Sequence, residues 1–294
     1  MRHITRWNAR WAPLLGFALL WVWPGSAEAA ELHVPASLEA GQAFSIPTEG
    51  TGQATFYFIG PDHVVKRSVS LGRDLQIQSS DVNAAGRYQV VICDSSCASA
   101  TFQVQPTKPA HLSFFLHPSR VPVSTPNSID ATAFAFDQYY NLVLNPTRVD
   151  FLITPAKGNG FSRPTSTRNG VVWMRMDSTS REGPVEVTAA LGSVKEPRVI
   201  QQVAAEACGL HMKAVESGNM VILETDPVRD CTGNPLSDGT VVSFTKVDNA
   251  GKSTVDTPIK KGVARTQFSL HGPAQISVAC GVVLGNEVTI RGQI

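Results

Sequence analysis

Short stretches of alternating apolar and polar residues fill most of the chain after its first 30 residues. In 129–136, for example, Thr132, Phe134 and Phe136 occupy alternate positions and therefore share one face of an extended strand. Between 31 and 105, turn residues separate such stretches about every 8–12 positions, a spacing typical of β-sandwiches. Apolar residues at helical spacing are not sustained there over a window of about 11 residues. The pattern predicts an all-β protein.

The later part of the chain contains a duplicated unit. Residues 230–244, a turn followed by a strand, have a degenerate copy at 137–151, 93 positions earlier and without a gap. A second match, at an offset of 89, aligns the Gly-Pro pair at 183 with the one at 272. The first match keeps the turn residues and the alternating apolar pair of the strand: Asp137 with Asp230, Asn141 with Asn234, Val149 with Val242 and Phe151 with Phe244.

Composition along the chain indicates the boundaries of three units. Pro106 and Pro109 enclose a short link that is stiff and cannot donate to a β-ladder. The next join, within 199–206, has no proline or glycine, so we expect a stiffer junction. The predicted domains are 30–105, 107–203 and 204–294, each with about seven strands, enough for two packed sheets.

Residues 1–29 have the features of a cleaved signal peptide. Three arginines precede a 13-residue apolar run that ends at Trp23, and Ala27 and Ala29 form an A-x-A cleavage site. A membrane anchor is the alternative, although the run is shorter than the roughly 17–25 residues that span a bilayer. We therefore expect an exported protein without a membrane span after cleavage.

Charge and motif content exclude several classes of function. Removing the leader's three arginines and one glutamate from the 25 basic and 24 acidic residues leaves 22 and 23. Such a balance indicates no nucleic-acid partner. The seven histidines are scattered without metal-ligand spacing, and nucleotide-binding and Gly-x-Ser-x-Gly motifs are absent. We predict a protein that is not an enzyme and has no cofactor and no metal.

All five cysteines lie in the exported part, where disulfides persist. Cys93 and Cys97 flank three residues between two strand-like runs. In an extended chain they would be about 13 Å apart, whereas a disulfide requires less than about 7 Å, so we expect a hairpin clipped at its tip. Metal binding by this pair is the alternative. Of Cys208, Cys231 and Cys280, at most two can pair.

The residues of the duplicated unit carry a family resemblance. The run 230–244, followed by Lys261-Gly-Val-Ala and by Gly272-Pro-Ala-Gln-Ile-Ser-Val-Ala, resembles the bacterial immunoglobulin-like domains of the invasin/intimin group. The second domain departs from it at Tyr140 and Leu142, where the pattern has Gly and Pro. The first domain resembles only the wider immunoglobulin-like class, through a segment that ends at Tyr88 and is similar to a tyrosine corner. The resemblance implies three tandem immunoglobulin-like β-sandwiches.

The implied topology places the last three cysteines at the end of the third domain that faces the second. We expect Cys231 to pair with Cys280, because both adjoin turns that recur in the second domain. A Cys208–Cys280 bond is the alternative. Tyr139 and Tyr140 are expected near the first junction, where they would pack between domains.

The same topology places the Cys93–Cys97 tip at the free outer end of the first domain. We propose a contact surface there, with the alternative that the disulfide only pins a hairpin. Its residues are Glu49, Gly50, Thr51, Gly52, Asp94, Ser95 and Ser96. Asp230, Asn234 and Asp238 are expected to shape a turn, with a calcium loop as the alternative.

Immunoglobulin-like domains serve as spacers, adhesin stalks and binding modules alike. We therefore expect an exported, non-catalytic, adhesin-like binding and spacer protein of the bacterial cell envelope or the extracellular space. Its location would be periplasmic, cell-surface-associated or secreted, and its partner a protein or glycan at the cell surface or in the envelope. Alternatives are a periplasmic structural or assembly subunit of a larger envelope complex and a small secreted hydrolase.

Overall fold

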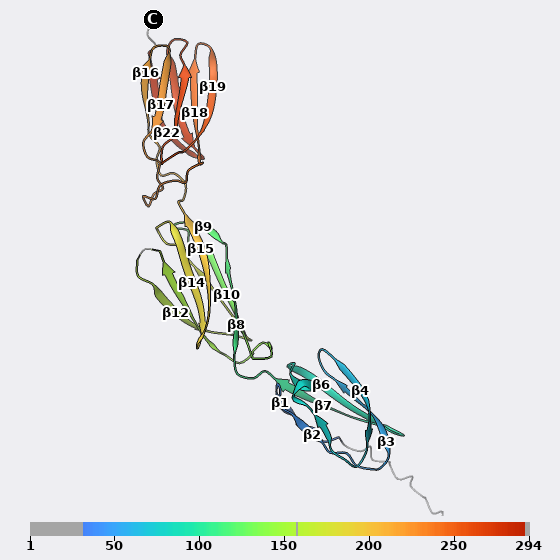
Figure 1. Cartoon of the computed structure of the whole chain (residues 1–294). Coiled ribbons are helices and arrows are strands. Elements are labelled where there is room, and N and C mark those ends of the chain that lie inside the picture. Colours follow the sequence, from blue (N-terminus) through green and yellow to red (C-terminus); the bar gives the residue numbers. More distant parts are fainter. Residues whose placement is uncertain (1–31, 157, 292–294) are drawn as a thin grey trace, which may run out of the picture.

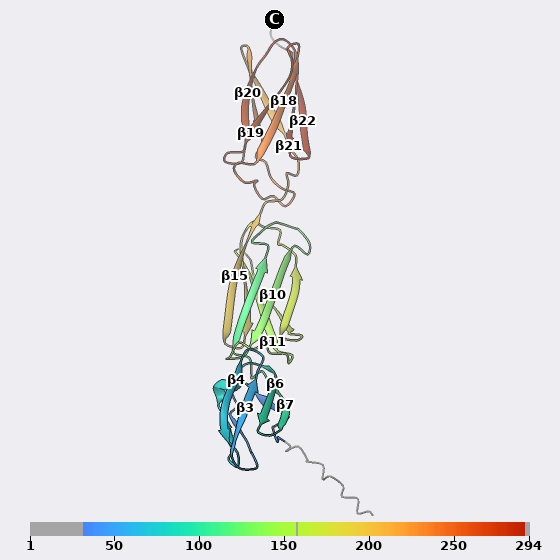
Figure 2. The same cartoon turned by 90° about the vertical axis from the view of Figure 1, so that its right-hand side faces the viewer.

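The computed structural model describes residues 32–156 and 158–291, and the predicted signal peptide lies outside them. Three β-sandwiches follow one another along an elongated path (Figures 1 and 2). The described residues form no α-helix, only a 3-10 turn at Ser79–Val82, and they include no helix long and apolar enough to cross a membrane. The all-β prediction is confirmed.

The first sandwich packs a five-stranded sheet, in the order β1-β7-β6-β3-β4, against the pair β2-β5. Its first strand begins at Ser37. The strands are β1 (Ser37–Glu39), β2 (Phe44–Ile46), β3 (Gln53–Ile59), β4 (Val64–Ser70), β5 (Leu75–Ile77), β6 (Gly86–Cys93) and β7 (Cys97–Gln105).

The second sandwich packs the sheet β13-β10-β8 against β12-β11-β14-β15-β9. Strand β9 runs parallel to β15, and the other pairings are antiparallel. The strands are β8 (His111–His117), β9 (Arg120–Pro122), β10 (Ile129–Phe136), β11 (Arg148–Pro155), β12 (Phe161–Ser166), β13 (Val171–Met176), β14 (Gly183–Leu191) and β15 (Val194–Val203).

The third sandwich repeats this plan with the sheets β16-β17-β20 and β19-β18-β21-β22. The duplicated phenylalanines, Phe151 in β11 and Phe244 in β18, are both completely buried, so the repeat preserves the core position of this strand. The strands are β16 (Met212–Ser217), β17 (Met220–Thr225), β18 (Val241–Asp248), β19 (Gly251–Pro258), β20 (Arg265–Ser269), β21 (Ala274–Cys280) and β22 (Val283–Ile290).

Strand β10 directs its small residues to the core and its aromatic residues outward. Its alanines at 131, 133 and 135 are completely buried, whereas Phe134 and Phe136 are partly exposed on the opposite face. The space beside the alanines is filled by the rings of Phe114 and Phe151, whose centroids lie 5.6 Å apart. On the outer face, the rings of Phe134 and Phe115 meet edge to face, with their centroids 6.0 Å apart. The alternation therefore predicted the strand without revealing which face meets the core.

This orientation predicts unequal losses of stability for two similar substitutions. Phe151→Ala removes a buried ring and should destabilise the second sandwich by about 3–5 kcal/mol. Phe134→Ala loses only outer-face aromatic contacts and should cost at most about 1.5 kcal/mol. Calorimetric unfolding of both variants measures the difference. Equal losses would contradict the outward placement of Phe134.

Candidate functional site

The predicted hairpin tip is present at the outer end of the first sandwich. Cys93 ends β6 and Cys97 begins β7, and the two residues are paired across the ladder. Their Cα atoms are 4.1 Å apart, and the sulfurs form a disulfide. Asp94 organises the residues between them, because its Oδ1 accepts hydrogen bonds from the Ser96 backbone at 3.0 Å and the Ser95 hydroxyl at 3.3 Å.

A cavity of about 230 Å³ opens beside this tip. Of the predicted contact residues, Glu49 and the segment 94–96 line it, whereas residues 50–52 lie in the adjoining exposed loop and do not line it. The sequence did not indicate the apolar part of the wall, which includes Leu32, Leu71 and Ile92. These side chains come from separate segments, so only the folded chain brings them together.

The cavity combines acidic groups with an apolar wall. Hydrogen bonding, first from the Ser96 backbone, lowers the pKa of Asp94, so this carboxyl group is ionised at neutral pH. Gly50 and Gly52 adopt positive φ angles of 94° and 107°, which allows the loop to turn tightly next to Glu49.

The expected Cys231–Cys280 disulfide is wrong, and so is the Cys208–Cys280 alternative. The structure joins Cys208 to Cys231, with Cα atoms 4.6 Å apart. Cys280 is a free thiol, 6 % exposed, within the hydrophobic core of the third sandwich. Burial raises the pKa of the Cys280 thiol, which lowers its reactivity.

The physical reason is the course of the segment that enters the third sandwich. Oδ2 of Asp230 accepts a hydrogen bond from the backbone of Ala205 at 3.1 Å. Ala207 then forms a β-bridge with Asp230, and the Cys208 backbone donates to the Arg229 carbonyl at 2.9 Å. The entering segment therefore runs beside the turn, which brings Cys208 next to Cys231.

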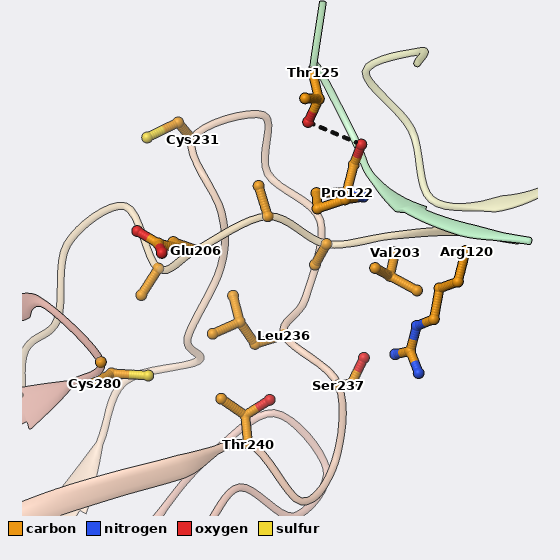
Figure 3. Close-up of a pocket in the computed structure, with 14 residues that line it drawn as sticks. Arg120, Pro122, Thr125, Val203, Glu206, Cys231, Leu236, Ser237, Thr240 and Cys280 are labelled. Atoms are coloured by element: carbon orange, nitrogen blue, oxygen red, sulfur yellow. Dashed lines mark hydrogen bonds between the residues drawn. The ribbon is translucent and has the colours of Figure 1, made fainter. Parts of the chain in front are cut away.

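A second cavity, of about 730 Å³, lies between the second and third sandwiches (Figure 3). Its wall is mostly small and apolar, including Pro122, Val203 and Leu236, with Arg120 at one side. The Cys280 side chain lines it from the third sandwich. The cavity offers space but few convergent polar groups, so we assign it no chemistry.

The first junction is held by the side chains of Asp137 and Asn141. Asp137, completely buried, accepts hydrogen bonds from the Thr107 backbone in the linker at 3.0 Å and from the Asn141 side chain at 2.9 Å. The Asn141 amide then crosses to the first sandwich. Its Nδ2 donates to the Asn83 carbonyl, and its Oδ1 accepts from the Ala85 backbone, both at 2.7 Å.

The second junction uses the duplicated residues in the same way. Asp230 accepts from the Ala205 backbone in the linker at 3.1 Å and from the Asn234 side chain at 3.0 Å. Asn234 Nδ2 donates to the Ser180 carbonyl at 2.9 Å, and its Oδ1 accepts from the Glu182 backbone at 3.2 Å. We call each Asp–Asn pair, with the carbonyl and N–H that its asparagine contacts, a junction clamp.

The two tyrosines predicted near the first junction lie in different surroundings. Tyr139 lies against the first sandwich as expected, because a Cβ atom added at Gly41 would be only 2.0 Å from the Tyr139 hydroxyl oxygen. Tyr140 instead stacks on His111 of its own sandwich, with ring centroids 4.4 Å apart.

The acidic residues of the 230–238 turn, for which a calcium loop was the alternative, are engaged by backbone donors. Asp238, for example, accepts a hydrogen bond from the Lys261 backbone at 2.8 Å. In the part of the chain that the structure describes, no cluster of His, Cys, Asp or Glu is arranged to hold a metal ion.

Two solved bacterial proteins have a similar arrangement of sandwiches. The FdeC adhesin of Escherichia coli matches with a TM-score of 0.57 and 13 % identity, covering 88 % of this chain and 95 % of that one. Invasin, a bacterial integrin-binding protein, matches with a TM-score of 0.52 and 11 % identity, covering 88 % and 58 %. No family model and no curated sequence matches the chain. The likeness confirms the immunoglobulin-like fold of the invasin group, and at these identities it shows the fold alone.

The cysteine pairing predicts a specific map of the oxidised protein. Peptide mapping without reduction should yield Cys93 linked to Cys97 and Cys208 linked to Cys231. Cys280 should react with an alkylating reagent only after unfolding, because its thiol is buried. A peptide linking Cys231 to Cys280, or rapid alkylation of Cys208 in the folded protein, would contradict the map.

The second clamp predicts a pH dependence of stability. Burial raises the pKa of Asp230, but the hydrogen bonds from Asn234, Thr232 and Ala205 outweigh it and lower the pKa to about 2. An aspartate in the unfolded chain has a pKa of about 3.9. The stabilisation is therefore complete above about pH 5 and is lost as the pH falls through about 4 towards 2.

Calorimetry between about pH 6 and pH 2 measures this effect in the wild type and in Asp230→Asn. The variant should be clearly less stable at the upper pH and close to the wild type at the lower one. Parallel profiles of the two proteins would refute the role of Asp230. The comparison is made between variants because other carboxyl groups, such as Asp226 and Asp248, also have lowered pKa values.

Proposed function

We propose that the chain is an exported, non-catalytic, adhesin-like binding and spacer protein of the bacterial envelope or the extracellular space, with domains 30–105, 107–203 and 204–294. The observation that carries the proposal is the repeated junction clamp, which links successive sandwiches through partly buried side-chain hydrogen bonds. Because each clamp restricts how its two sandwiches can reorient, the chain can hold its outer tip at a distance. The fold shared with bacterial adhesins supports this function.

The contact surface in this proposal is the first-domain tip. Its disulfide-closed hairpin and the 49–52 loop lie on either side of a cavity, at the end of the first sandwich opposite the first clamp. A partner can therefore approach without meeting the other two sandwiches. The carboxyl groups of Glu49 and Asp94 favour a partner with positive charge at the point of contact.

The edge strands favour this reading over an envelope subunit that docks by adding a strand. One edge strand of each large sheet carries residues that discourage further pairing. These are Lys66 and Arg67 in β4, Arg163 and Pro164 in β12, and Lys252 in β19. Binding through the tip leaves these edges free.

The proposal is tested by screening the exported protein against bacterial-surface, host-matrix and glycan arrays. The double variant Glu49→Ala/Asp94→Ala should lose about tenfold or more of the affinity for whichever surface binds, because two charges at the contact are removed. The matched control, Glu216→Ala/Glu224→Ala, removes two exposed acids from the third sandwich and should bind normally.

Equal binding by both double variants would exclude the tip as the contact surface. Capture of a stoichiometric envelope complex that neither variant weakens would favour the assembly-subunit function instead.

A further inference from the structure

The clamps dock on a loop that recurs in all three sandwiches. In the first two, the asparagine of the following sandwich contacts the carbonyl of one residue and the N–H of the residue two positions later, at 83 and 85 and at 180 and 182. A glycine with positive φ comes next in each loop, Gly86 at 149° and Gly183 at 128°. We call residues 83–85, 180–182 and their third-domain equivalents, 269–271, the docking loops.

The third docking loop has the same form. Gly272 follows it with a φ of 94°, and the offset of 89 places Ser269 and His271 at the positions of Ser180 and Glu182. The equivalence is supported by strand pairing, because Val185 pairs with Pro155 in the second sandwich just as Ala274 pairs with Asp248 in the third. The Ser269 carbonyl and the His271 N–H are therefore the groups that a further asparagine would contact.

Both groups already have partners within the third sandwich. The Lys246 Nζ donates to the Ser269 carbonyl at 2.8 Å and also to Asp248 Oδ2. The His271 backbone, acting as a nearby donor, helps to lower the pKa of the Asp248 carboxyl, and the His271 ring Nδ1 lies 3.5 Å from Asp248 Oδ2. Lys246 supplies the donor and Asp248 the acceptor that one asparagine amide supplies at each junction.

The pair occupies positions that are apolar or small in the other sandwiches. Lys246 pairs across the sheet with Ile276, as Ile153 does with Val187 and Phe58 with Val90. Ile153 and Phe58 are core residues, 4 % and 2 % exposed.

The side chains of Lys246 and Asp248 are likewise buried, only 6 % and 1 % exposed. A buried ion pair is often no more stabilising than apolar residues of similar volume, so stability alone does not account for it. What the pair does accomplish is to place a donor on the Ser269 carbonyl and an acceptor beside the His271 N–H.

We propose that Lys246 and Asp248 close the third docking loop from within, so that this end of the third sandwich does not accept a following domain that carries an Asp-x-x-x-Asn turn. The partner excluded is thus a further domain of the same kind, including a second copy of this chain's third domain. The loop 47–52 of the first sandwich contains no Asp-x-x-x-Asn sequence, so the first sandwich cannot supply a clamp to another copy. Clamps between the third sandwich of one copy and the first sandwich of another, which would otherwise produce open filaments, are therefore blocked on both sides of the contact.

A four-domain chain tests the proposal. A second copy of residues 204–294 is joined directly after residue 293, and the rotational correlation time of this fourth domain is measured by amide relaxation in NMR. With Lys246 and Asp248 present, the fourth domain should reorient independently of the third. In Lys246→Ile/Asp248→Gly, the fourth domain should dock and its correlation time should rise about twofold or more. The substitutions introduce Ile, as at 153, and Gly, as at 60, because Gly60 follows Phe58 by two positions just as Asp248 follows Lys246.

The matched control carries Asn234→Ala only in the appended copy of the opened chain, and it should restore independent reorientation. Lys246→Met is a smaller change, because it removes only the donor to the Ser269 carbonyl and leaves Asp248 in place. A fourth domain that moves as one body with the third in the unsubstituted chain would overturn the proposal, whether or not the variants fold. Independent motion in folded opened chains would also overturn it.

Discussion

The arrangement of the three sandwiches depends on two buried carboxylates that form no ion pair with any residue in the described ranges. Asp137 and Asp230 are 0 % and 4 % exposed, and N–H donors of the linker, the turn and the nearby asparagine surround them. A buried charge is tolerated only when hydrogen bonds replace its hydration. The donors that meet this requirement come from the segment entering each sandwich, so the local chemistry of one aspartate also determines how the linker lies.

The same constraint determines the covalent structure of the third sandwich. Because Asp230 holds Ala205, the segment that follows is drawn against the turn, and Cys208 comes within bonding distance of Cys231. Cys280 lies on a strand whose side chains alternate, and its position directs the thiol inward. The contacts of the entering segment with the turn thus account for which two of the three thiols pair.

The second sandwich shows how packing distributes residues of different size. Small residues of β10 face the core because Phe114 and Phe151 occupy the space there, and the strand's own rings stand on the outer surface. Phe115 and Trp173, on the neighbouring strands, are 61 % and 57 % exposed, so the outer face of this sheet is rich in aromatic residues. Arg175 lies over the Trp173 ring at 5.2 Å and pairs with Asp130 at 2.8 Å, which covers part of that surface.

The sequence by itself determined the all-β class, the duplication of the second and third units and the clipped hairpin at Cys93 and Cys97, because alternation, repeat offsets and a three-residue separation are local properties of the chain. Only the tertiary structure decided the Cys208–Cys231 bond, the apolar wall of the tip cavity, the side of β10 that meets the core and the contacts of Asn141, Asn234 and Lys246. These features depend on contacts between segments that are distant in sequence. In addition, the asparagines and Lys246 bind backbone groups, and every residue type except proline presents the same backbone N–H and C=O. A pattern of side chains therefore indicates that a turn can reach outward, while the folded chain alone determines which carbonyl and N–H it meets.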